Sequence, residues 1–225
     1  MNGKMQKHLD DYKVLIVDMD GTLYHQAQVR RRMAIKLFIC YLTRRVRFKE
    51  LMILREYRKL RETREFSESD DFEEKQIDII SGKYGVKPER VKDVLGAWMI
   101  DIPLKYIRMS RDVNLIGTLT QMRAAGKVII IYSDYPVKDK LKALELNTDF
   151  AFCAEDPEIR CMKPDTKGLK HIISVSGKDI EEILFIGDRE ERDGECAARI
   201  GMDHLILPPG KRRRKRLYKE LIQNG

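Results

Sequence analysis

Apolar residues of this chain fall into short continuous runs, separated by longer segments with helical periodicity. The run Val14–Val17 is apolar at every position and rich in β-branched residues, and residues 128–132 and 183–186 are similar. Strands that are buried on both faces of a sheet have this pattern. With two weaker runs added, we expect strands at residues 14–17, 128–132, 151–153, 183–186 and 204–207.

The segments between these runs have apolar residues at the spacing of an α-helix. Helices are expected at residues 111–125, 138–146, 167–175, 190–200 and 212–222. Strands that alternate with such helices are typical of a parallel, doubly wound sheet, so the sequence predicts an α/β fold with a Rossmann-like core.

One long segment departs from this alternation. Residues 26–109 have helical periodicity almost throughout and no strand-like run. We expect them to form an all-helical domain, inserted between the first and second strands. The α/β core would then comprise residues 1–25 and 110–225, enough chain to bury a hydrophobic core.

The net charge of +8 is concentrated in two parts of the chain. Residues 26–65 contain thirteen Lys or Arg and four Glu, a balance of +9, and residues 211–225 have a balance of +6. The rest therefore carries −7, so a basic insertion and a basic tail are attached to an acidic body. No apolar run approaches the roughly 20 residues that span a bilayer, and we expect no signal peptide. The cysteines lack metal-site spacing, so we expect a reduced, cytoplasmic protein.

Two carboxylates follow the first strand directly. Asp18 and Asp20 are two residues apart, and alternate side chains of an extended chain point the same way. We therefore expect both carboxylates to converge at the carboxyl edge of the sheet, where open α/β folds bind ligands. Like charges placed together at the end of an apolar strand are costly unless a cation lies between them.

Polar residues follow three other strands in the same way. The second strand runs into Ser133 and Asp134, Lys163 follows the third, and the fourth leads to Asp188 with Asp193 five residues later. Each alone is ordinary, because a serine after a strand is usually a turn residue and a Lys-Pro pair is usually a solvated helix start. Together they predict one polar site at one edge of a parallel sheet.

This arrangement resembles the haloacid-dehalogenase superfamily of phosphohydrolases. The residues that carry the resemblance are the sequence DMDGT at residues 18–22, Ser133, Lys163 with Pro164, and GDREERD at residues 187–193. Within that superfamily the chain looks most like the phosphoglycolate-phosphatase type, whose helical cap is inserted between the first and second motifs. The resemblance thus implies that residues 26–109 are a cap.

The resemblance also implies roles for these residues. Asp18 would attack phosphorus and become an aspartyl-phosphate, and Asp20 would protonate the leaving alkoxide and later take a proton from water. Asp18, Asp20, Asp188 and Asp193 are the implied metal-site residues, with Mg²⁺ as the cofactor, although Asp193 could instead orient a water on the metal. Ser133, Asp134 and Lys163 are the implied phosphate-binding residues; Asp134 would hold the phosphoryl-binding loop, although its negative charge is unfavourable beside a phosphate.

The basic part of the insertion allows more than one interpretation. It can be a helical hairpin with one face solvated, or a surface that binds anionic lipid or a polyanionic substrate. Nucleic acid is disfavoured, because no nucleic-acid-binding module is visible. We therefore expect a cytoplasmic Mg²⁺-dependent phosphatase acting on a small-molecule phosphomonoester, with a possible peripheral association with membranes. The alternatives are a phosphomutase of the same fold and a basic binding protein.

Overall fold

A computed structural model describes residues 8–43, 48–61 and 72–223. Its sheet has five parallel strands in the order β3-β2-β1-β4-β5. The strands are β1 (Val14–Val17), β2 (Val128–Ser133), β3 (Phe150–Cys153), β4 (Ile183–Gly187) and β5 (Asp203–Ile206). The predicted α/β fold is confirmed, and each predicted strand lies within one residue of its observed position.

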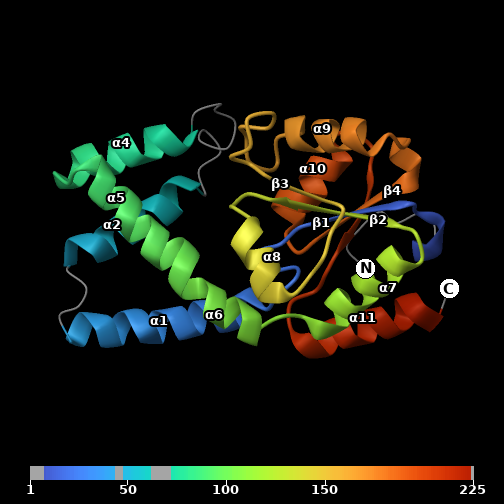
Figure 1. Ribbon diagram of the computed structural model, residues 1–225, viewed down its shortest axis with the longest axis horizontal. Coiled ribbons are helices and arrows are strands. Elements are labelled where there is room, and N and C mark those ends of the chain that lie inside the picture. Colours follow the sequence, from blue (N-terminus) through green and yellow to red (C-terminus); the bar gives the residue numbers. More distant parts are fainter. Residues whose placement is uncertain (1–7, 44–47, 62–71, 224–225) are drawn as a thin grey trace.

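Helices cover both faces of this sheet (Figure 1). On one face, Ile16, Ile130 and Phe185 pack with α9 (Lys167–Ser176) and α10 (Glu195–Ala198). On the other, Leu15 and Ile131 pack with helices α7 (Val113–Ala124), α8 (Lys138–Leu144) and α11 (Lys211–Gln223). Because alternate side chains of each strand enter opposite layers, the central strands β1 and β4 have no polar side chain.

The strand register aligns the ends from which the site is built. Val17 pairs with Ile131 of β2 and with Ile186 of β4. The residues that follow these three strands are therefore brought to the same edge of the sheet. Single-turn 3₁₀ helices at Leu9–Asp11 and Ile180–Glu182 precede β1 and β4 at the opposite edge.

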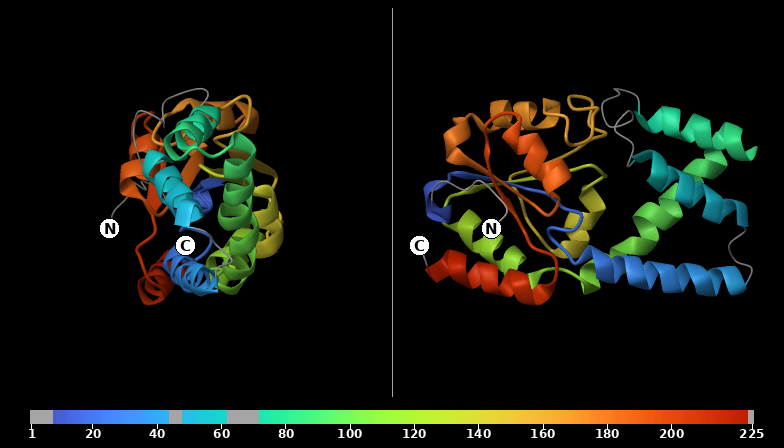
Figure 2. Two further views of the ribbon diagram at one scale, coloured as in Figure 1. Left: turned by 90° about the vertical axis from the view of Figure 1, so that its left-hand side faces the viewer. Right: turned by 180° about the vertical axis from the view of Figure 1, so that it is seen from behind.

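The described part of the inserted segment is almost wholly helical, as predicted. It contains α1 (Gln26–Leu42), α2 (Phe48–Arg61), α4 (Phe72–Tyr84), α5 (Pro88–Leu95), a π-helical stretch (Gly96–Asp101) and α6 (Ile102–Met109). These helices lie to one side of the sheet, at the left of Figure 1, and Figure 2 shows the same arrangement from two other directions. The proposed boundaries of core and cap stay a prediction.

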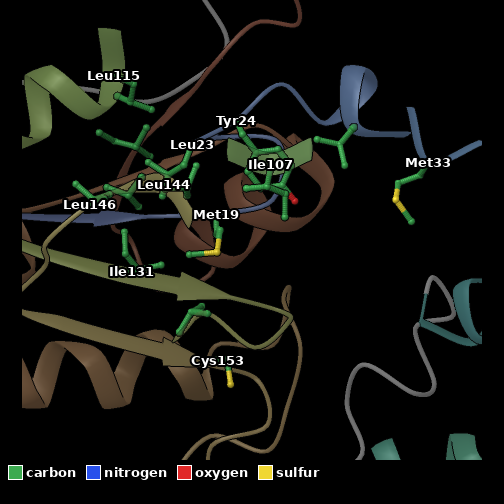
Figure 3. Close-up of a cluster of buried hydrophobic side chains, with 14 of the residues drawn as sticks. Met19, Leu23, Tyr24, Met33, Ile107, Leu115, Ile131, Leu144, Leu146 and Cys153 are labelled. Atoms are coloured by element: carbon green, nitrogen blue, oxygen red, sulfur yellow. The ribbon is translucent and has the colours of Figure 1, made fainter. Parts of the chain in front are cut away.

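One hydrophobic cluster joins the inserted helices to the sheet layer. Figure 3 shows Met33 of α1 and Ile107 of α6 in the cluster that also contains Ile131 and Leu144 of the core. The first turn after β1 contributes Leu23 and Tyr24 to it. The inserted helices are therefore anchored on the same side of the sheet as α8.

The segment predicted as one helix over residues 190–200 begins differently. Residues Glu190–Gly194 form a π-helical turn, and α10 starts only at Glu195. The cause is Asp193, whose Oδ2 accepts the backbone N–H groups of Asp188 and Arg189 at 3.1 Å each. A side chain that bonds backbone N–H groups in this way competes with regular helix formation.

Candidate active site

The loop after β1 presents the Asp18 carboxylate at the edge of the sheet. Asp18 is buried, and its Oδ2 accepts the Thr22 hydroxyl at 2.9 Å. Gly21 has φ +108°, and a Cβ at this position would lie 2.1 Å from Asp188 Oδ2. A side chain is therefore excluded both by the backbone conformation and by the approach of Asp188. The glycine of this motif lets the loops after β1 and β4 meet.

Three carboxylates lie together between these loops. Asp18, Asp188 and Asp193 each have a carboxylate oxygen within 4.8 Å of the others, the only such acidic group found in the described part of the chain. Asp188 Oδ1 is buried and has no hydrogen-bond partner among the described residues. Burial and the charge of Asp193 raise the pKa of Asp188 to about 6. A buried carboxylate oxygen without a hydrogen-bond partner, beside two other carboxylates, fits a hard divalent cation such as Mg²⁺.

Lys163 lies inside this acidic group. Its buried Nζ donates to Asp18 Oδ1 at 2.5 Å and to Asp193 Oδ1 at 2.6 Å. Burial raises the pKa of Asp18 well above its usual range, although the charge of Lys163 opposes that rise. Three carboxylates and one ammonium leave a formal surplus of negative charge, which a divalent cation would neutralise.

Asp193 uses both of its oxygens for other contacts. Oδ1 accepts Lys163 Nζ, and Oδ2 accepts the two backbone N–H groups after β4. Of the two roles left open by the sequence, this geometry favours positioning over direct ligation. Gly187 makes room for the Asp193 side chain, because a Cβ at residue 187 would lie 2.4 Å from the Asp193 Cβ.

The Asp20 carboxylate is held apart from the acidic group. Lys140 Nζ donates to its two oxygens at 2.6 and 2.7 Å, Ser133 Oγ donates to Oδ2 at 3.0 Å, and the Tyr24 hydroxyl donates to Oδ1. Burial alone would raise the pKa of Asp20, but the charge of Lys140 and these hydrogen bonds lower it. The Asp20 side chain, expected among the metal ligands, is thus not brought to the acidic group.

Two of the predicted phosphate-binding residues contact other protein groups. Ser133 is fully buried and donates to Asp20, so its hydroxyl positions that carboxylate. Asp134 Oδ1 accepts the backbone N–H of Lys163 at 2.9 Å. Asp134 therefore holds the backbone of the Lys163 loop.

Several basic residues of the site are not predicted from the sequence. Arg61 of α2 is buried, donates to the Asp134 carbonyl at 2.8 Å, and stacks on Tyr135 with its guanidinium 4.4 Å from the ring centroid. Arg192 donates to the Lys163 carbonyl at 2.5 Å and to the Arg61 carbonyl at 3.0 Å. These arginines and Lys140 stand in strongly charged helices, where the sequence gives no sign of which cations are buried.

Two neighbouring cavities open at this edge of the sheet. A small one of about 60 Å³ is lined by Asp18, Lys163, Asp188 and Arg192, among others. A larger one of about 340 Å³ lies between the loop after β1 and the inserted helices. Asp20, Gln26, Arg30 and Tyr135 line both cavities. The Asp20 carboxylate thus stands where a molecule with one end at Asp18 would enter the larger cavity.

Comparisons with known proteins agree with this geometry. Residues 12–201 match the family model of haloacid dehalogenase-like hydrolases. The chain is similar to proteins named glyceraldehyde 3-phosphate phosphatase in Methanopyrus kandleri (29% identity, covering 88% of this chain and 85% of the relative) and Methanocaldococcus jannaschii (26% identity, 88% and 86%). Its fold is similar to that of a magnesium-bound HAD hydrolase of Bacillus subtilis (TM-score 0.61, 15% identity, covering 96% of this chain and 99% of that one).

Proposed function

The chain belongs to the haloacid dehalogenase-like hydrolases and is a phosphatase, and we propose that it hydrolyses a small phosphomonoester through an aspartyl-phosphate on Asp18. The observation that carries this proposal is the position of the Asp18 carboxylate, beside the Lys163 ammonium and at the wall of a 60 Å³ cavity. A cavity of that size has room for a phosphoryl group, and its lining supplies a nucleophile and a cation.

The proposed chemistry uses each polar residue of the site in one role. Asp18 Oδ attacks phosphorus while Lys163, which already contacts Asp18, binds a phosphoryl oxygen. Asp20, at the boundary of the two cavities, gives a proton to the leaving alkoxide and later takes one from the water that hydrolyses the aspartyl-phosphate. Ser133, Tyr24 and Lys140 hold the Asp20 carboxylate in place for both steps.

We further propose that Mg²⁺ is the cofactor. Asp18 and Asp188 would bind it, with Asp193 fixing the loop that carries Asp188. The orphaned Asp188 Oδ1 supports this assignment. When bound, Mg²⁺ supplies charge neutralisation between a phosphate dianion and the carboxylates. Activity should vanish with a chelator and return with added Mg²⁺, and full activity in excess chelator would contradict the assignment.

The direct test of the proposed reaction is Asp18→Asn. The amide conserves size but cannot attack phosphorus, so release of phosphate from p-nitrophenyl phosphate should be lost while the fold is retained. Asp101→Asn, an exposed position outside both cavities, is the matched control. Unchanged turnover in the Asp18 variant would refute the nucleophile. A phosphomutase would release little free phosphate from any sugar phosphate at steady state.

We also propose a cytoplasmic location, with peripheral binding to anionic membranes through α1. All four cysteines are buried and free, which supports a reducing compartment. No helix of the described residues is both long and apolar enough to cross a bilayer. However, α1 is apolar on two sides, because Val29, Met33 and Cys40 are buried while other apolar side chains of its outer face are exposed: Ile35 (54%), Phe38 (61%), Ile39 (50%) and Leu42 (63%).

The basic residues that flank these apolar positions in the sequence favour lipid over a second copy of the chain. The exposed Arg31 precedes the apolar side chains, and Arg44, Arg45 and Arg47 follow them in the sequence, although these three lie outside the described residues. A symmetric dimer would bring the same basic residues together, whereas each basic residue contributes about 1 kcal/mol near an anionic bilayer. Of the other basic residues of the insertion, Arg30 lines the cavities and Arg32 donates to Ser110 at 2.6 Å.

Vesicle co-sedimentation tests this proposal. The wild type should bind vesicles of equimolar phosphatidylglycerol and phosphatidylcholine, more weakly as salt is added, and should not bind phosphatidylcholine alone. Phe38→Ser combined with Leu42→Ser should abolish binding, while the control pair Val113→Ser and Val175→Ser, also exposed apolar positions, should not. Equal binding by all three proteins, or dimerisation that the Phe38 and Leu42 variant alone removes, would overturn the lipid proposal.

A further inference from the structure

The larger cavity continues from the smaller one at the general acid. Asp20, which would protonate the leaving group, lines both, as do Gln26 and Arg30. When a phosphoryl group occupies the 60 Å³ cavity beside Asp18, the bridging oxygen must face Asp20, and the rest of the substrate must extend into the 340 Å³ cavity. The lining of the larger cavity therefore describes the leaving group.

One wall of this cavity is apolar. It is formed by Val29 and Met33 of α1, Trp98 and Met99 of the π-helical stretch, and Pro103 and Ile107 of α6. Trp98 and Ile107 are themselves almost fully buried, so this wall is well packed. Figure 3 shows that Met33, Ile107 and Tyr24, which line the cavity, belong to the cluster that anchors the inserted helices to the core. Such a wall favours an apolar body over a polyhydroxylated one.

The same cavity is also lined by two arginines. Arg30 is in the second turn of α1 and Arg58 is in α2. Within the described part of the chain neither guanidinium forms an ion pair or a side-chain hydrogen bond, in contrast to Arg61, which pairs with Glu155 at 2.8 Å. Guanidinium groups that line a cavity without a carboxylate partner are suited to bind an anion.

We propose that the substrate is a phosphomonoester whose leaving group has a ring-sized apolar body and a second anionic group, bound by Arg30 and Arg58. This proposal rests on the proposed phosphatase function, because it takes Asp18 to mark the phosphoryl end. Trp98 and Met99 contact the apolar body, and the guanidiniums of Arg58 and of Arg30, which lines both cavities, hold the second anionic group. The residues that recognise the leaving group thus come from the inserted helices.

The size of the cavity favours a leaving group larger than three carbons. Glyceraldehyde has about six non-hydrogen atoms, which occupy at most about 180 Å³ even if each takes the ~30 Å³ of a liquid water molecule. The cavity has a volume of about 340 Å³. The glyceraldehyde 3-phosphate of the named relatives would therefore leave much of it unfilled and its arginines without an anion.

The first experiment compares three substrates by phosphate release: p-carboxyphenyl phosphate, phenyl phosphate and glyceraldehyde 3-phosphate. We expect kcat/KM to be about tenfold higher for the carboxylated ring than for the neutral ring. Arg30→Gln and Arg58→Gln should each reduce this ratio severalfold. Arg55→Gln, exposed on the same helix as Arg58 and outside both cavities, should leave it unchanged. Equal rates for the two rings, a preference for glyceraldehyde 3-phosphate, or an unchanged ratio in both arginine variants would overturn the proposal.

A second experiment does not depend on catalysis. Trp98 is the only tryptophan of the chain and lines the cavity, so its fluorescence reports occupancy directly. Cyclohexanecarboxylate should change Trp98 emission at a lower concentration than cyclohexanol, and Arg58→Gln should reduce the difference severalfold. If Asp18→Asn keeps full activity but the binding preference is observed, Asp18 is not the nucleophile, while the leaving-group site is supported. If neither compound changes Trp98 emission in an active enzyme, the leaving-group site is refuted and the proposed phosphatase function is not affected.

Discussion

Replacing Arg214 with methionine should destabilise the protein strongly, although Arg214 belongs to a run of six basic residues. Unlike its neighbours, Arg214 is only 3% exposed. Its guanidinium donates to the carbonyls of Gly21 at 2.5 Å and Thr22 at 2.8 Å, so α11 holds the loop that carries Asp18 and Asp20. It also donates to the Pro208 carbonyl and lies 3.4 Å from the buried Asp112 carboxylate.

The expected magnitude follows from these contacts. Methionine keeps most of the aliphatic packing but leaves the Asp112 carboxylate without its cation and three carbonyls without a donor. Breaking one side of a buried ion pair costs about 3–5 kcal/mol. That is a large part of the roughly 5–15 kcal/mol that separates a folded domain from its unfolded state, and it corresponds to a fall in Tm of about 10 °C.

The assay is urea denaturation followed by circular dichroism, with the free energy of unfolding obtained by linear extrapolation. Arg213→Met, at an exposed position, is the control and should differ from the wild type by less than about 0.5 kcal/mol. In the Asp112→Asn background, Arg214→Met should cost less, because the unpaired charge is gone. A loss below about 1 kcal/mol for Arg214→Met would refute the assigned role.

Two further predictions concern the carboxylates of the site. Because burial raises the pKa of Asp188 to about 6, protons should compete with Mg²⁺ below that pH. The Mg²⁺ concentration for half-maximal activity should rise about tenfold per pH unit below 6, and a constant value between about pH 5 and pH 7 would contradict this. Because Lys140 lowers the pKa of Asp20, Lys140→Met should raise that pKa and move the alkaline limb of the pH profile of kcat/KM to higher pH. The control Lys140→Arg keeps the positive charge and should not move this limb. An unchanged limb in the methionine variant would contradict the role of Lys140.

The fold could be predicted from the sequence because local pattern and global packing agree in it. The strands of this sheet are covered on both faces, so their apolar runs are unmistakable, and the predicted boundaries differ from those observed by one residue at most. The strand-end carboxylates could be located for the same reason, since the register of β1 with β2 and β4 brings their ends together. The helix expected from residue 190 begins as a π-helical turn, a difference that the sequence pattern does not show, because Asp193 bonds the backbone there.

The rest of the site could not be predicted, because it depends on which charged residues are buried. Lys140, Arg61 and Arg214 lie in helices that are rich in exposed lysine or arginine, and no periodicity distinguishes them from their neighbours. Their burial is a consequence of tertiary partners that are distant in sequence, such as Asp20 for Lys140. The sequence shows only that the insertion and the tail are basic. In the structure each of them also supplies a buried arginine, Arg61 from the insertion and Arg214 from the tail.

Asp20 lies apart from the acidic group, and its negative charge is compensated by a different lysine. Lys140 forms a neutral pair with Asp20, while Lys163 only partly compensates Asp18, Asp188 and Asp193. The negative surplus is thus confined to the side of the nucleophile, where a divalent cation fits, and does not extend toward the cavity of the leaving group. An anionic leaving group can therefore approach Arg30 and Arg58 without facing an unpaired carboxylate at Asp20. Without Lys140, the negative charge of Asp20 would repel an anionic leaving group. The Lys140–Asp20 ion pair and the arginines of the larger cavity therefore favour the same class of substrate.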